Sequence, residues 1–293
     1  MKISRKKSKQ DLTAFLSYLK TGEPITALIA PAGWTVLPNF PKILGIFRAL
    51  GVRVFFPVLP YADITAWVYY RFLKEGKTET FISSACVGIS RNFPYIVRKV
   101  YSPLLCAARY LKTYRRIDGR FAFFSPCDQK RFEFTVRREN DQEEALVHFN
   151  ITLEALSDWL TAEGIDAESY PPVEVFGNAG DGIDFSRGLT VEYFGTISGA
   201  LSAVVPELEY AVSEGLTEAR QFHNAESLRR PVFFEPYACV GGCANGSGVP
   251  TFLRKKTLKN RVNRPSGEAK AAILERFTRF DRDLKVRDFC HGL

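Results

Sequence analysis

The sequence predicts an α/β fold built on parallel strands. Short apolar runs of strand length alternate with amphipathic segments of helix length through the first 165 residues. Cysteines follow three of the apolar runs, as expected where ligands gather at the carboxyl ends of parallel strands. Of the 293 residues, 46% are hydrophobic and 25% are charged. This composition is typical of a globular chain with a buried core and excludes a disordered or fibrous one.

The first elements follow a β-α-β-α-β order, which parallel strands joined by helical crossovers require. Proline ends the first apolar run at Pro31, and glycine ends the first helical pattern at Gly51. In order, we expect a strand at 25–30, a helix at 40–50, a strand at 52–57, a helix at 64–74 with Asp63 as its N-cap, and a strand at 80–84.

The second half gives fewer clear signals. Residues 120–124 form an apolar run that leads into Cys127, and Thr152 is the expected N-cap of a helix that extends to Gly164. A Pro-, Gly- and Asp-rich stretch predicts a loop at 170–187. Later we expect a Gly-rich turn at 195–203 that opens a helix to about Ser213, and a strand at 231–236.

The net charge of +8 comes from two short segments. Residues 1–10 hold five Lys or Arg and residues 254–264 hold six, and neither segment contains an acidic residue. The rest of the chain has 29 basic and 32 acidic residues, so the body is mildly acidic. No nucleic-acid recognition motif accompanies the charge, so we expect no nucleic-acid partner.

No apolar window is long enough for a membrane-spanning helix, and no apolar leader follows the basic N-terminus. We therefore expect a cytoplasmic protein without a membrane partner. The six cysteines are then expected to stay reduced and to serve metal binding, redox chemistry or packing.

Four cysteines are candidate metal ligands: Cys86, Cys127, Cys239 and Cys243. The last two form a C-x3-C pair in a glycine-rich turn, where backbone amides can approach thiolate or sulfide closely. Burial as small hydrophobic residues and zinc binding are alternatives for this set. For Cys106 and Cys290 we favour a packing role.

Three segments together resemble the catalytic domain of the iron-only (FeFe) hydrogenases. The sequence S-S-A-C-V-G at 83–88 is similar to the family's T-S-C-C-P-G motif, and S-P-C-D-Q-K-R-F-E at 125–133 is similar to M-P-C-x-x-K-K-x-E. Y-A-C-V-G-G-C-A-N-G at 237–246 is similar to M-A-C-P-G-G-C-x-x-G. The resemblance extends over 25–250, with a basic segment at 1–24 before it and wrapping segments at 251–293 after it.

The resemblance implies a two-lobed catalytic domain, in which each lobe has a mostly parallel sheet with flanking helices and the cluster lies in the crevice between the lobes. It also implies a 4Fe-4S cubane joined to a two-iron unit with CO, cyanide and azadithiolate ligands. The implied cubane ligands are the four candidate cysteines, with Cys243 as the bridge. Lys130 matches the lysine that binds a cyanide, and Ala30 and Pro31 match a turn that holds the other cyanide. A solvated surface lysine is the alternative for Lys130.

Several positions depart from the family pattern. Ala85 stands where the family has a proton-delivering cysteine, and alanine has no proton to relay. Ser125 and Tyr237 stand where methionines pack on the two-iron unit. The family's acidic residues after the A-D-L-T stretch are replaced by W-V-Y-Y at 67–70, and its S-P-Q-Q segment reads S-P-L-L at 102–105.

We therefore expect a hydrogenase-like protein that interconverts H2 with protons and electrons slowly, with hydrogen sensing as one use of that chemistry. The alternatives are an iron–sulfur assembly scaffold without the two-iron unit and an interaction protein that has kept the fold. Lys130 favours the first, because a protein without the two-iron unit has no cyanide to bind. The chain as given has no ferredoxin-like cysteine set, so we expect an external electron carrier such as a ferredoxin, and separate maturation proteins.

Overall fold

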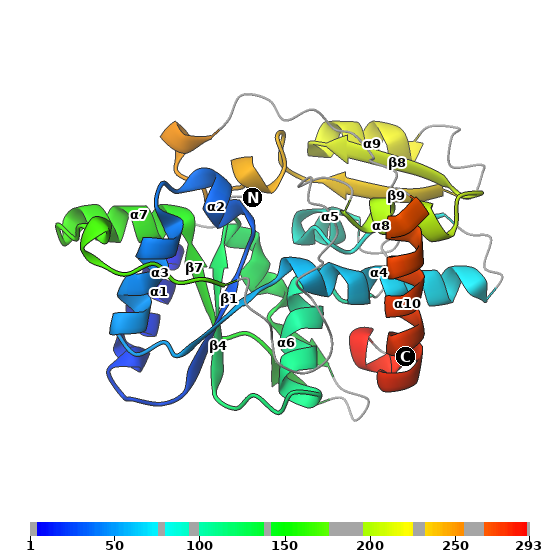
Figure 1. Cartoon of the computed structure of the whole chain (residues 1–293). Coiled ribbons are helices and arrows are strands. Elements are labelled where there is room, and N and C mark those ends of the chain that lie inside the picture. The colour runs from blue at the N-terminus through cyan, green and yellow to red at the C-terminus, as the bar shows by residue number, and fades with distance from the viewer. Residues whose placement is uncertain are drawn as a thin grey trace.

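Two parallel β-sheets organise the chain (Figure 1). The computed structural model describes residues 5–75, 80–93, 100–137, 142–175, 196–224, 232–254 and 267–291. The predicted α/β class with parallel sheets and flanking helices is confirmed.

The first sheet has the strand order β2-β1-β4-β7, and all neighbouring strands are parallel. Its strands are β1 (Ile25–Ile29), β2 (Val54–Pro57), β4 (Arg120–Ser125) and β7 (Phe149–Thr152). Ala27 and Ile29 of β1 belong to one hydrophobic core, while Leu28 belongs to another. Because alternate residues point to opposite faces, both faces of this sheet are buried, as parallel sheets require.

The second sheet has the order β3-β9-β8 and is also parallel. Its strands are β3 (Phe81–Ile82), β8 (Glu209–Glu214) and β9 (Val232–Tyr237). Phe233 packs in the largest core and Phe234 in a small third core, so both faces of β9 are again covered. A separate antiparallel pair is formed by β5 (Thr135–Arg137) and β6 (Glu143–Ala145).

Helices cover both faces of the first sheet (Figure 1). One face packs against α1 (Arg5–Leu19), α3 (Phe40–Ala49) and α7 (Leu153–Ala162), and the other against α6 (Pro103–Thr113). The second sheet packs against α8 (Thr196–Val204) on one face and against α5 (Val87–Asn92) and α9 (Leu216–Asn224) on the other. The remaining helices are α2 (Ala32–Val36), α4 (Ala62–Lys74) and α10 (Gly267–Asp283).

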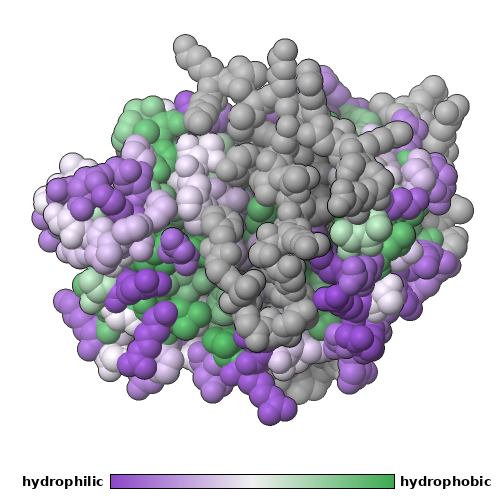
Figure 2. Space-filling view, in the orientation of Figure 1, coloured by the Kyte–Doolittle hydropathy of each residue, from purple (hydrophilic) through white to green (hydrophobic). Residues whose placement is uncertain are grey.

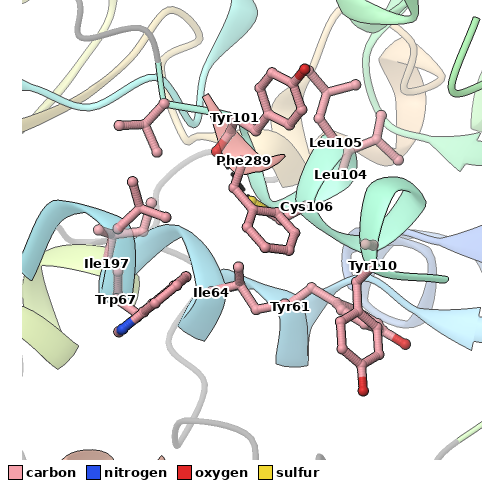
Figure 3. Close-up of a cluster of buried hydrophobic side chains, with 14 of the residues drawn as sticks. Tyr61, Ile64, Trp67, Tyr101, Leu104, Leu105, Cys106, Tyr110, Ile197 and Phe289 are labelled. Carbon is pink, nitrogen blue, oxygen red and sulfur yellow. Dashed lines mark hydrogen bonds between the residues drawn. The ribbon is translucent and has the colours of Figure 1, made fainter. Parts of the chain in front are cut away.

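The largest core lies where α4, α6 and α10 meet the sheets. Figure 3 shows Phe289 pointing into the space between Ile64 of α4 and Cys106 of α6. The indole of Trp67 is 1% exposed and donates to Asp281 of α10 at 2.9 Å. This core therefore fixes the C-terminal helix against the helices that border the candidate site.

Three local expectations need correction. The strand at 80–84 shortens to β3 and pairs with β9, so it joins the second sheet and not the sheet of β1 and β2. The helix expected to reach Ser213 ends at Val204, and β8 follows it. Asp63 lies inside the first turn of α4 and is not its N-cap. Most of the loop expected at 170–187 lies outside the described residues.

Hydrophilic residues gather on the outer surface of α7 in Figure 2, in keeping with a helix that buries only its inner face. None of the helices in the described parts of the chain is both long and apolar enough to cross a membrane.

Candidate metal centre

Three cysteine-bearing turns follow strands from both sheets. Cys86 comes after β3, Cys127 comes two residues after β4, and Cys239 comes two residues after β9. The carboxyl ends of parallel strands therefore deliver all three turns, as the sequence predicts. Cys243 begins the short 3-10 helix η6 (Cys243–Asn245) within the third turn.

The first and third turns are in close contact. The backbone N–H of Ala238 donates to Sγ of Cys86 at 3.4 Å. A Cβ added at Gly88 would lie 2.7 Å from the Cβ of Ala238, so only glycine allows this approach without a shift. An amide hydrogen bond to a ligating sulfur is one of the contacts that stabilise iron–sulfur clusters.

The second and third turns also pack backbone against backbone. Gly248 donates its N–H to the carbonyl of Pro126 at 2.9 Å. A Cβ at Gly246 would lie 2.2 Å from that carbonyl oxygen, so a side chain there would push the turns apart. The hydroxyl of Ser247 lies 3.8 Å from Sγ of Cys127 and donates to the carboxylate of Asp128. The glycines of the third turn thus let it close on Cys127.

The thiols of the candidate ligands interact electrostatically, and this interaction affects their pKa values. Burial is the main cause that raises the pKa of Cys239 to about 11, and the thiol of Cys86 raises it further. Burial and the other three thiols also raise the pKa of Cys127. Without metal the thiols of Cys127 and Cys239 are therefore protonated near neutral pH, and metal binding would release their protons.

This donor set suits an iron–sulfur cluster. No three thiol, imidazole or carboxylate groups within the described ranges lie close enough to share a single metal ion. In a cubane each thiolate binds a separate iron, so four cysteines need not meet at one point. The roles of the four cysteines as ligands stay a prediction.

A cavity of about 140 Å³ lies beside Cys243, well above the roughly 10–15 Å³ that one water needs. Residues from both sheets line it: Ala30, Pro31, Ala32, Val58, Leu59, Ala62, Ala85, Pro103, Leu104, Phe123, Pro126, Cys127, Lys130, Ile197, Glu235, Tyr237 and Cys243. The wall is mostly apolar with a few polar groups, the usual character of a small-molecule or cofactor site.

Lys130 brings a positive charge to this cavity. It lies in the 3-10 segment η2 (Asp128–Glu133), and its Nζ donates to the carbonyl of Ala85 at 3.1 Å and to Oε1 of Glu133 at 2.6 Å. Burial acts to lower the pKa of Lys130, but the charge and hydrogen bond of Glu133 outweigh it and hold the pKa above its usual value. Its side chain is 13% exposed, so Lys130 is not a solvated surface lysine.

Most of the residues expected to hold the cofactor meet at this cavity. Ala30, Pro31, Ala85, Lys130 and Tyr237 line it together with Cys127 and Cys243. Cys86 and Cys239 are not part of the lining.

Ser125 does not line the cavity either. Its buried hydroxyl accepts from the N–H of Cys127 and donates to the carbonyl of Cys127, both at 3.0 Å. Ser125 thus fixes the backbone of the Cys127 turn without contacting the cavity.

Glu235 is a cavity residue that sequence reasoning missed. It is 1% exposed, accepts from the N–H and hydroxyl of Ser198 at 2.8 Å each, and accepts from the hydroxyl of Tyr237 at 2.7 Å. Burial raises its pKa, and these hydrogen bonds oppose the rise. The signal available in the sequence is a lone acid in an otherwise apolar strand, because such an acid requires partners supplied by the fold.

Comparison with known proteins identifies the family and agrees with the fold. The family model described as iron only hydrogenase large subunit, C-terminal domain, matches residues 24–247. Among solved structures, HydA(deltaEFG) superposes on this chain with a TM-score of 0.62. That structure is described as revealing stepwise assembly of the FeFe hydrogenase H-cluster. It has 18% sequence identity, and the alignment covers 96% of this chain and 98% of that chain, so this likeness shows the fold. No curated protein matches the sequence.

Proposed function

The chain belongs to the family of the iron-only hydrogenase large subunit, C-terminal domain. On this premise we propose that it binds an H-cluster and slowly interconverts H2 with protons and electrons. The four cysteines would hold a 4Fe-4S cubane, with Cys243 as the bridge to a two-iron unit in the cavity. When bound, the two-iron unit supplies the site at which H2 is formed or split.

One observation carries the proposal: Lys130 and Cys243 line the same cavity. A buried ammonium stabilises an anionic group that has lost its water, and a cyanide ligand is such a group. Ala30 and Pro31 on the same wall would enclose the cofactor on a second side. In an assembly scaffold that holds only the cubane, Lys130 would serve only its ion pair with Glu133.

The residues present favour slow turnover. Ala85 lies on the cavity wall but cannot hold or pass a proton. The hydroxyl of Tyr237, which could otherwise offer a proton, donates to Glu235. Slow turnover suits a protein that reports hydrogen. Electrons would come from an external carrier such as a ferredoxin, and maturation proteins would deliver the two-iron unit. An anaerobic, cytoplasmic setting stays a prediction.

The test is anaerobic reconstitution with iron and sulfide, followed by loading of a synthetic two-iron unit and infrared spectroscopy. We expect a cubane together with CO and cyanide stretching bands, and slow H2-dependent dye reduction. A cubane that never acquires these bands would support the scaffold function. Failure to assemble any cubane would contradict both.

A further inference from the structure

Glu214, the last residue of β8, contacts the turn that carries two of the cysteines. Its Oε2 accepts from the backbone N–H of Gly241 at 2.6 Å. Gly241 lies midway between Cys239 and Cys243, and Glu214 is neither a candidate ligand nor a cavity residue. We propose, on the basis of the function above, that Glu214 is a positioning residue that holds this turn in its ligating shape and lowers the reduction potential of the cubane.

The turn needs such support because its backbone is unusual. Gly241 and Gly242 have φ values of 78° and 59°, a region that glycine enters readily but at a large entropic cost on ordering. A hydrogen bond from an amide to a carboxylate is stronger than one to a neutral oxygen. It offsets part of that cost before any metal has bound.

The end of β8 is itself anchored. Gly215 donates its N–H to the carbonyl of Tyr237 at 2.8 Å, and a Cβ at Gly215 would lie 3.1 Å from Cγ2 of Val240. Strand β8 also pairs with β9 along its whole length, up to the pair formed by Glu214 and Tyr237. The carboxylate is therefore presented by a rigid sheet.

Within the described part of the chain, the carboxylate of Glu214 is only partly compensated. Its Oε1 is buried and has no hydrogen-bond partner among the described residues, and none of them forms an ion pair with it. A negative charge beside a cluster opposes the addition of an electron, because local charge and hydrogen bonding set the potentials of iron–sulfur clusters. The cubane should therefore be harder to reduce than it would be without Glu214.

The neighbouring Glu218 offers a matched control. Its Oε2 accepts from the backbone N–H of Glu214 at 3.1 Å, so it lies close by but does not contact the turn through that bond. Glu214→Gln removes the charge and keeps an oxygen that can accept from Gly241. Glu218→Gln removes the same charge from a neighbouring residue in α9.

The first experiment measures the midpoint potential of the reconstituted cubane by EPR-monitored redox titration in the full chain. We expect Glu214→Gln to shift the potential to a more positive value than either the wild type or Glu218→Gln shows. Equal potentials in the two variants would overturn the electrostatic role of Glu214.

The second experiment needs no cluster. Hydrogen exchange at the Gly241 amide is measured in the metal-free protein, where we expect Glu214→Ala to raise the exchange rate about tenfold, from the loss of a charged hydrogen bond. An unchanged rate would overturn the positioning role. If the exchange result holds but the wild type assembles no cubane, the proposed function fails while the positioning role of Glu214 stands.

Discussion

Nζ of Lys130 lies 2.6 Å from Oε1 of Glu133, and both side chains are nearly buried. The hydroxyl of Ser102 donates to the same Oε1 at 2.7 Å. Glu133 thus compensates the charge of the lysine that borders the cavity. A buried charge that loses its partner is strongly destabilising, so the two residues act as a unit.

We expect Lys130→Met to lower the free energy of unfolding by about 3–5 kcal/mol, because it leaves the Glu133 carboxylate without its cation. The double variant Lys130→Met with Glu133→Gln should recover most of this loss, as measured by urea unfolding of the metal-free protein. Both variants should fail to retain the two-iron unit. A double variant as unstable as the single one would show that the pair is not coupled.

Cysteine substitutions test the ligand set. Cys127→Ser and Cys239→Ser should each sharply lower iron content from about four per chain, since thiolates are the preferred ligands of such clusters. Cys106→Ser is the control: Cys106 is 0% exposed and its Sγ accepts from the hydroxyl of Thr65 at 3.3 Å, in the helical core. Equal iron loss in the control would refute the assignment.

Ala85→Cys tests whether proton supply limits turnover. Ala85 lines the cavity, so a thiol there would face the cofactor site. Because positioned proton transfer is typically worth about 10²–10⁴ in rate, we expect H2-dependent dye reduction to rise toward the lower end of this range in loaded protein. Ala62→Cys places a thiol elsewhere on the same wall. A similar gain in both variants, or none in either, would argue against a relay at position 85.

The basic segment at 254–264 is the predicted docking site for the electron carrier. Arg254 donates to the carbonyl of Val249 at 3.1 Å. Burial raises the pKa of Cys239, and the nearby charge of Arg254 opposes this rise. Residues 255–264 lie outside the described residues. Changing Arg254, Lys255, Lys256 and Lys259 to Gln should slow cubane reduction by an acidic ferredoxin and flatten its dependence on ionic strength.

The matched control removes four cations from the N-terminal segment, at Arg5, Lys6, Lys7 and Lys9. It should leave both the rate and the salt dependence near those of the wild type. If the two variants behave alike, electrons enter elsewhere.

We expect His148 to make the fold sensitive to acid. Burial, followed by repulsion from Arg120 and Lys112, lowers its pKa from 6.5 to about 4. Its Nδ1 accepts from the N–H of Phe121 at 3.2 Å, which a protonated ring cannot do.

The folded state therefore disfavours the proton that the unfolded chain accepts. This contribution to stability is complete above pH 6.5 and is lost as the pH falls from 6.5 to about 4. Urea unfolding across this range should show a shallower loss for His148→Gln than for the wild type. Parallel curves would assign the acid sensitivity to other groups.

The sequence by itself determined several local elements and the position of the cysteine turns after strands. Apolar runs that end at proline or before a cysteine predicted strands near β1, β4 and β9. Thr152 caps α7 as expected, because its side chain accepts from the N–H of Ala155 at 3.2 Å. Such features depend on residues close together in the chain. Motif spacing likewise identified the family before any contact was known.

The tertiary structure alone decided which strands pair and which charges are compensated. Nothing near residues 80–84 indicates that β3 pairs with β9, about 150 residues away, and nothing near Glu235 indicates that Ser198 would satisfy it. The contact of Ser102 with Glu133 and that of Gly241 with Glu214 are also set by the approach of separate segments. A short apolar strand can join either sheet, so its pairing depends on how the whole chain packs. A buried acid needs a hydrogen-bond partner, and that partner can come from any part of the fold.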